Sequence, residues 1–132
     1  MKEGYKVENG VGIIPEGVTS IDYHAFGGCK SITSITIPEG VIEIRDCAFD
    51  ECESLTTVVI PKGVTSIGDC AFWGCKSLTS ITIPKGVASI GKNVFGVCDN
   101  LQHIYVPEES IDYYKSMRSL EPYVDIISAY EE

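Results

Sequence analysis

The chain has 132 residues, of which 44% are hydrophobic and 22% charged, a composition typical of a folded globular protein. Its 10 Lys and Arg against 19 Asp and Glu give a net charge of -9, which argues against nucleic acid and anionic membranes as partners. No run approaches the roughly 20 apolar residues that a membrane helix needs. Residues 1–6 are too polar to begin a secretory signal. We therefore expect no membrane insertion, and either a cytoplasmic protein or one whose signal lies outside this sequence.

A unit of 23 residues recurs along most of the chain. The spacing is visible in the prolines at Pro15, Pro38, Pro61, Pro84 and Pro107. A fixed period in the twenties is typical of a solenoid, in which a unit that cannot bury its own apolar face stacks on copies of itself. We predict a single domain over residues 1–132, with an N-terminal cap at 1–14, four 23-residue repeats at 15–106 and a C-terminal cap at 107–132.

Residues 1–14 are an incomplete repeat. Ile14 keeps the register of the repeats, but Asn9 and Gly12 stand where the repeats carry aliphatic residues. Asn-Gly is typical of the turn of a β-hairpin. Asn9-Gly10 therefore predicts a short hairpin between residues 5–8 and 11–14 that covers the first turn of the core.

The four repeats share the pattern Leu-x-x-Ile-x-Ile, whose last four residues alternate in and out as a strand does. The pattern predicts a parallel sheet with three inward columns: Ile32/Leu55/Leu78/Leu101, Ile35/Val58/Ile81/Ile104 and Ile37/Ile60/Ile83/Val106. A second, shorter extended rung is expected on the other flank from the columns Val18/Val41/Val64/Val87 and Ile21/Ile44/Ile67/Ile90. A stacked column of Phe26, Phe49, Phe72 and Phe95 and a short helical or 3₁₀ turn should close each coil.

The period changes after Pro107. Ile111, Tyr114, Met117 and Leu120 recur every three residues, which predicts a helix over residues 108–120. Pro122 is expected to stop that helix, and residues 123–127 are apolar enough for a final strand or packed segment. This segment should cover the last coil, which would otherwise expose an apolar edge and an unpaired strand.

The cysteines fall into two columns. Cys29, Cys52, Cys75 and Cys98 occupy one position of successive repeats, where we expect buried free thiols. A line of residues spaced at about 4.8 Å cannot converge on one zinc ion, so this column is not expected to bind metal. Cys47 and Cys70 form a shorter column that continues as His24 and Asn93, and its variability suggests a partly exposed position. Whether Cys47 and Cys70 form a disulfide is left open by the sequence.

No catalytic constellation is visible in the sequence. The two histidines, His24 and His103, lie in different columns and several repeats apart, so they are not expected to meet. Dinucleotide-binding, P-loop and zinc-protease motifs are all missing from the sequence. We expect no enzymatic activity, no cofactor and no metal ligand.

The outward face of the predicted sheet is the candidate ligand surface, because solenoids use such extended surfaces for recognition. It comprises Thr33, Ser34, Thr36, Thr56, Thr57, Val59, Thr79, Ser80, Thr82, Gln102, His103 and Tyr105. The alternative is that threonine occurs on this face only because it favours β-strands whose side chains contact solvent, and not because it binds a ligand. Trp73, whose column also contains Gly27, Asp50 and Gly96, is a candidate exposed aromatic contact.

The unit Leu-x-x-Ile-x-Ile-Pro-x-Gly-Val-x-x-Ile-x-x-x-Ala-Phe-x-x-Cys, here Leu55 to Cys75, resembles the BspA-like class of leucine-rich repeats. The resemblance implies a β-rich right-handed coil with parallel strands, short 3₁₀ or helical turns and a C-terminal helical cap. It also implies a cell-surface or secreted bacterial or protozoan protein, in some cases an adhesin.

Two functions follow as expectations. The first is a non-enzymatic module that binds a protein or glycan as part of a bacterial cell-surface or secreted adhesin-like protein. The second is a structural spacer or self-assembling scaffold without a dedicated ligand, for which weak homo-oligomerisation is expected. A signal and a cell-wall anchor in the full reading frame would favour the first over the second.

Overall fold

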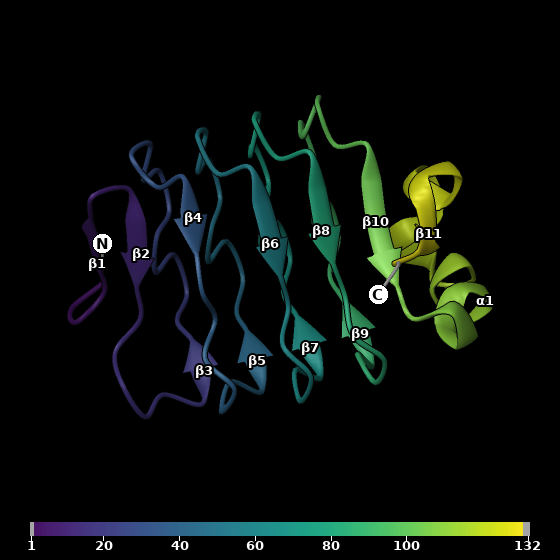
Figure 1. The fold of residues 1–132 in the computed structure, drawn as a ribbon, viewed down its shortest axis with the longest axis horizontal. Coiled ribbons are helices and arrows are strands. Elements are labelled where there is room, and N and C mark those ends of the chain that lie inside the picture. Colours follow the sequence, from purple (N-terminus) through teal and green to yellow (C-terminus); the bar gives the residue numbers. More distant parts are fainter. Residues whose placement is uncertain (1, 131–132) are drawn as a thin grey trace.

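A computed structural model of the protein describes residues 2–130. The chain winds as a solenoid whose coils lie side by side along the long axis of the molecule (Figure 1). Each of the four repeats contributes two strands. One belongs to the first array of strands, which is the longer of the two, and the other belongs to the second sheet. The prediction of a repeat solenoid with parallel strands is confirmed.

The first array runs from one end of the molecule to the other, and its register repeats every 23 residues: Val58 pairs with Ile81, and Ile81 with Ile104. β1 and β2 are antiparallel, and the other pairs are parallel. The array consists of two sheets, β1-β2-β4 and β6-β8-β10-β11, and between them the Thr56 amide donates to the Thr33 carbonyl at 3.4 Å. The strands are β1 (Lys6–Glu8), β2 (Val11–Ile13), β4 (Ser34–Ile35), β6 (Thr57–Val59), β8 (Ser80–Thr82), β10 (His103–Val106) and β11 (Ile127–Ala129).

The second sheet has shorter strands and is parallel throughout. One isoleucine of each strand points into the core, and these residues stack in a single column, as predicted. The strands are β3 (Ser20–Ile21), β5 (Glu43–Ile44), β7 (Ser66–Ile67) and β9 (Ser89–Ile90).

The four phenylalanines form a continuous stack through the core, with ring centroids 5.5, 5.2 and 6.1 Å apart. A tyrosine meets each end of the stack edge-on. Tyr5 lies 5.4 Å from Phe26 at an interplanar angle of 88°, and Tyr123 lies 5.5 Å from Phe95 at 84°. Edge-to-face contact suits a terminal ring because the positive ring edge meets the negative ring face. The two tyrosines thus close the aromatic column, and the sequence analysis did not identify them.

The N-terminal hairpin is formed as predicted. β1 and β2 pair antiparallel around Asn9 and Gly10, whose φ values of 51° and 82° are both left-handed. Two successive left-handed residues make the type I′ turn, whose twist matches that of the flanking strands.

The C-terminal segment departs from the predicted single helix over residues 108–120. It consists of a 3₁₀ turn (Glu108–Ser110), the short helix α1 (Ile111–Lys115) and a second 3₁₀ segment (Arg118–Ile126). Pro122 lies inside that second segment instead of ending a helix. The break falls at Met117, which is extended with ψ of 128°. Packing provides the reason, because the buried Tyr114 hydroxyl donates to the Pro84 carbonyl and fixes α1 against the last coil.

The final strand also differs from the expectation. β11 shares only Ile127 with the predicted segment 123–127 and continues to Ala129, and it adds to β10 in parallel with Ile104 opposite Ile127. It therefore covers the edge of β10 that the last coil would otherwise expose.

Cys47 and Cys70 are half-buried, which confirms the partial exposure predicted for their column, and the backbone of this column is left-handed. His24, Cys47, Cys70 and Asn93 have φ values of 55°, 59°, 56° and 55°. Asn and His are enriched in this region among non-glycine residues. A second left-handed column contains Gly28, Glu51, Gly74 and Val97.

All six cysteines are free thiols. In the column of four, Cys52 and Cys75 are buried as predicted, whereas the terminal members Cys29 and Cys98 are half-buried. The sulfur of each later member lies near the carbonyl of a phenylalanine in the preceding coil, at 3.3 Å for Cys52 and 3.2 Å for Cys75. The thiol can donate to that carbonyl, which an aliphatic residue of the same size could not do.

Candidate functional site

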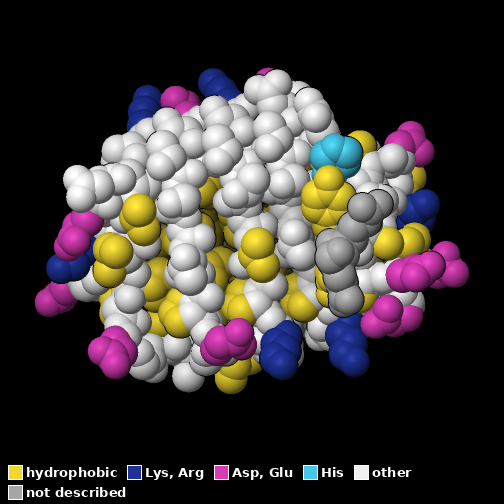
Figure 2. Space-filling model, viewed as in Figure 1, with side chains coloured by type: hydrophobic (Ala, Val, Ile, Leu, Met, Phe, Trp, Pro, Cys, Tyr) yellow, Lys and Arg dark blue, Asp and Glu magenta, His cyan; other side chains and the backbone are white. Residues whose placement is uncertain are grey.

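The strand face is the outward surface of the first array of strands. Nine of its twelve predicted residues are exposed, and Ser80, Thr82 and Tyr105 are half-buried. Inward neighbours such as Val58 and Ile81 are buried, so the alternation along each strand is the predicted one. The face is almost uncharged, and Figure 2 shows the acidic and basic side chains gathered around its rim.

Part of the hydroxyl array is used by the fold itself. The Thr33 hydroxyl donates to the Gly10 carbonyl at 3.3 Å, and the Thr79 hydroxyl donates to the Thr56 carbonyl at 3.2 Å. These bonds join adjacent coils at the start of each strand. The hydroxyls further along the strands, such as Thr57, stand on the exposed surface and are better placed to meet a ligand.

The strand face ends in a group of rings at β10. The His103 and Tyr105 rings stack with centroids 5.1 Å apart and an interplanar angle of 11°. They line a depression of about 670 Å³ together with Thr82, Ser128, Ala129 and Tyr130. His103, Tyr105 and Thr82 were predicted on this face, but the β11 residues were not. Ile127 lies 23 residues after Ile104 and so continues the spacing, but the intervening residues do not carry the other columns of the repeat.

Trp73 is not the exposed aromatic that was predicted. Its side chain is half-buried, and a Cβ at Gly96 in the next coil would overlap the indole ring. The small residue at position 96 is therefore explained by the tryptophan that covers it. Asp50, in the same column, leans the other way, because a Cβ at Gly27 in the preceding coil would lie 2.6 Å from its Oδ1.

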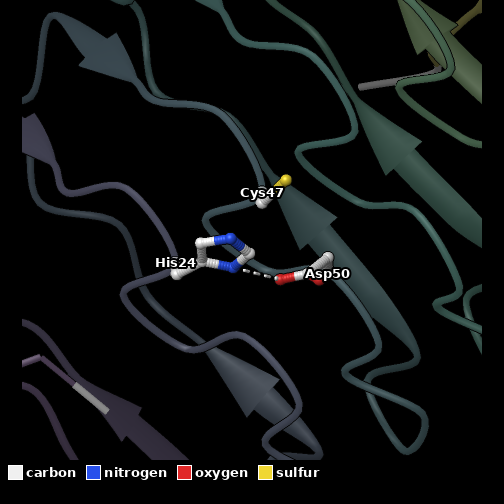
Figure 3. A group of neighbouring side chains, drawn as sticks. All are labelled: His24, Cys47 and Asp50. Atoms are coloured by element: carbon white, nitrogen blue, oxygen red, sulfur yellow. Dashed lines mark hydrogen bonds and ion pairs between the residues drawn. The ribbon is translucent and has the colours of Figure 1, made fainter.

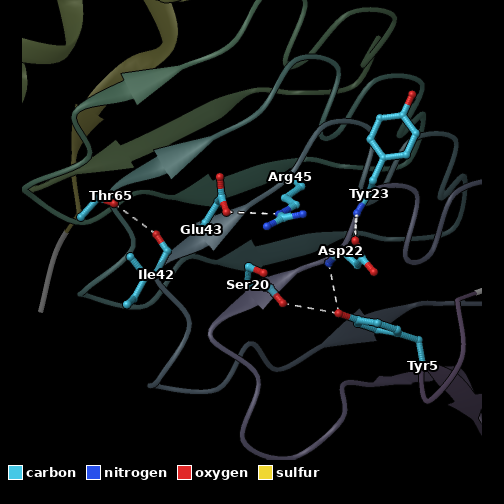
Figure 4. Close-up of polar contacts among 8 residues, drawn as sticks. All are labelled: Tyr5, Ser20, Asp22, Tyr23, Ile42, Glu43, Arg45 and Thr65. Atoms are coloured by element: carbon cyan, nitrogen blue, oxygen red, sulfur yellow. Dashed lines mark hydrogen bonds and ion pairs between the residues drawn. The ribbon is translucent and has the colours of Figure 1, made fainter.

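A groove of about 580 Å³ lies over the second sheet, lined by Tyr23, Glu43, Arg45, Asp69 and their neighbours. Several of its polar groups are paired with one another: the Arg45 guanidinium donates to Glu43 at 3.2 Å (Figure 4), and the Asp46 carboxylate accepts from the Asp69 amide at 2.8 Å. Outside the groove, the Tyr5 hydroxyl accepts from the Asp22 amide at 3.0 Å. These contacts hold the coils and the hairpin together, so we assign this groove a structural role.

A second cluster of reactive side chains lies where the first two coils meet. His24 Nδ1 is 3.2 Å from Asp50 Oδ1, and ligand atoms of His24, Cys47 and Asp50 all lie within 4.8 Å of one another (Figure 3). His24 is exposed, while Cys47 and Asp50 are half-buried. This cluster was not predicted, because its members come from two different columns of adjacent coils and share no single repeat position.

A Cys-His-Asp group also resembles the arrangement of cysteine nucleophiles, but the electrostatics oppose that use. Burial, followed by the nearby Asp50 carboxylate, raises the pKa of the Cys47 thiol to about 11. A cysteine nucleophile needs the thiolate, and therefore a lowered pKa.

The family model and the solved structures that match this chain all describe leucine-rich repeat proteins. The family model described as BspA type leucine rich repeat region matches residues 10–118 in six copies. A leucine-rich repeat protein from Bacteroides ovatus is 29% identical, with a TM-score of 0.71 over 87% of this chain and 29% of that one. The leucine rich repeat protein of T. pallidum is 36% identical, with a TM-score of 0.68 over 73% of this chain and 45% of that one.

A third structure carries a description of its location. A leucine rich cell surface protein from Faecalibacterium prausnitzii is 29% identical, with a TM-score of 0.56 over 95% of this chain and 36% of that one. This chain thus spans less than half the length of these solved relatives. No curated protein matches it. In the described part of the chain, none of the helices is long and apolar enough to span a membrane. With a family match over most of its residues, the chain belongs to the BspA-type leucine-rich repeat family.

Proposed function

We propose that the strand face binds a protein or glycan partner, and that the chain is a non-enzymatic recognition module of a bacterial cell-surface or secreted adhesin-like protein. The observation that carries the proposal is the uncharged, exposed array that ends at the stacked His103 and Tyr105 rings beside a depression. The cell-surface description of the Faecalibacterium relative supports the location.

The chemistry of the face suits such partners. Tyrosine offers a rigid apolar ring with a polar tip and loses little conformational entropy on binding, which is why interfaces are rich in it. The hydroxyl rows supply hydrogen-bond donors and acceptors without the desolvation cost of a buried charge. A sugar ring or a flat, weakly charged protein surface matches both features.

The test is direct binding of the purified protein to a glycan array, to host matrix proteins and to bacterial surface material. Once a ligand is found, Tyr105→Ala should weaken binding by at least about 30-fold, the loss expected for a hot spot of about 2 kcal/mol. Val59→Asp, at a residue that is 64% exposed on the strand face, should also weaken it.

Ile42→Asp is the matched control. Ile42 is 49% exposed beside the second sheet, so it receives the same charge outside the strand face and should bind as the parent does. Equal losses in both aspartate variants would refute the strand face as the site. Lack of any ligand, together with concentration-dependent association in sedimentation, would favour the alternative of a self-assembling spacer.

A further inference from the structure

Three different metal-ligating side chains converge at the boundary of the first two coils. His24 contributes an imidazole nitrogen, Cys47 a sulfur and Asp50 a carboxylate oxygen, all within 4.8 Å of one another. In tetrahedral coordination with bonds of about 2.0–2.3 Å, ligand atoms lie about 3.3–3.8 Å apart. If side-chain rotation moves the ligand atoms about 1 Å closer to one another, all three come within bonding distance of one ion.

We propose that His24, Cys47 and Asp50 bind a divalent transition-metal ion, with zinc as the best match, and that the ion joins the first coil to the second. Nitrogen, sulfur and carboxylate oxygen are the ligands that zinc takes in proteins, whereas calcium and magnesium prefer oxygen alone. The His24 side chain is 45% exposed and that of Asp50 is 17% exposed, so the ion can enter from solvent and keep a water as its fourth ligand.

The repeat makes this site specific to one boundary. The equivalent three positions are Cys47, Cys70 and Trp73 at the next boundary, and Cys70, Asn93 and Gly96 at the last. Neither of these sets supplies a comparable group of ligands. The solenoid backbone thus presents the same framework at each boundary, and only the first boundary carries three ligating side chains.

Gly27 leaves the space in which the side chains meet. A Cβ at this residue would lie 2.6 Å from Asp50 Oδ1 and 3.0 Å from His24 Nδ1. The protein's net charge of -9 further favours a cation over an anion as the ligand.

Cobalt(II) is the probe, because it occupies zinc sites and reports its ligands by absorption. The tag-free, reduced protein titrated with cobalt should bind one equivalent and show a thiolate-to-cobalt charge-transfer band in the near ultraviolet with tetrahedral bands in the visible. Zinc should displace the cobalt and should raise the melting temperature, because an ion that binds only the folded state stabilises it. A folded parent protein without the charge-transfer band would overturn the proposal.

At His24, Cys47 and Cys70, asparagine keeps the backbone intact, because Asn93 holds the same left-handed conformation in the last coil with φ of 55°. At Asp50, asparagine keeps the size and shape of the side chain and removes its charge. His24→Asn and Asp50→Asn should each weaken cobalt binding about 10- to 100-fold or more, and Cys47→Asn should abolish the charge-transfer band. Cys70→Asn is the control and should bind as the parent does. Loss of the band in Cys70→Asn with retention in His24→Asn would show a thiol pair instead and would refute this site.

Gly27→Ala tests the geometry without removing a ligand. It should weaken cobalt binding, since the added methyl group occupies the space between His24 and Asp50. Gly40→Ala is its matched control, because a Cβ there meets nothing closer than 4.0 Å. Equal affinity in the two alanine variants would contradict the placement of the ion.

Discussion

Replacing Glu51 by glycine is expected to stabilise the protein, because the backbone at this residue is in a conformation that is costly for a side chain. Glu51 has φ of 56°, and the same place in the neighbouring coils is occupied by Gly28 and Gly74 with φ of 73° and 77°. The Glu51 amide donates to the Trp73 carbonyl at 2.6 Å, a bond that glycine would keep.

The magnitude follows from two opposing terms. A side chain in the left-handed region costs roughly 1–2 kcal/mol. Removing the side chain relieves this cost, but glycine loses more backbone entropy on folding than glutamate does, which reduces the relief by roughly 0.5–1 kcal/mol. Glu51 is exposed, so little burial is lost with its side chain. The expected net gain is about 0.5–1 kcal/mol, which for 132 residues raises the melting temperature by about 2–4 °C.

Thermal and urea unfolding of Glu51→Gly, Glu51→Ala and the parent, followed by circular dichroism, measures this gain. Alanine removes the same charge and nearly the same side chain but keeps the Cβ that makes the left-handed conformation costly. We expect the alanine variant to melt close to the parent and the glycine variant to melt above both. If the two variants melt together, the stabilisation comes from charge removal and the backbone argument is wrong.

Three further predictions concern the core and the C-terminal segment. Phe72→Ala should cost about 3–5 kcal/mol in urea unfolding, because the ring is fully buried between Phe49 and Phe95; a cost below 1 kcal/mol would mean that the stack does not carry the core. Burial raises the pKa of Cys52 from 9.0 to about 12, so the folded state keeps a proton that the unfolded state loses, and stability should fall as the pH rises from 9 to 12. Cys52→Ala should flatten that fall, and an unchanged slope would contradict it. Truncation after Val106 should cause aggregation visible by light scattering, because it removes β11 and the ring that covers Phe95; a monomeric truncated protein with an unchanged melting temperature would show that the segment is not a cap.

The sequence by itself determined the repeat, its register and the side of each strand that faces the core. These follow from one period, because identical units can bury their apolar residues only by stacking in register. The columns of Ile81 and Phe72 could therefore be read from spacing alone, and the strand face is simply the other half of the same alternation. The hairpin at Asn9-Gly10 was predictable for a similar reason, since its turn chemistry is local.

The tertiary structure decided what the period does not specify. The edge-on tyrosines and the break at Met117 lie in segments that do not follow the repeat, so they depend on which surface is left to cover. β11 returns to the 23-residue spacing only after that interruption. Trp73 and Asp50 share a column but lean toward opposite coils, because each fills the space above a different glycine. His24, Cys47 and Asp50 come together because the path of the backbone sets the distance between different columns of adjacent coils. Left-handed residues shape this path, and they have no single sequence signature.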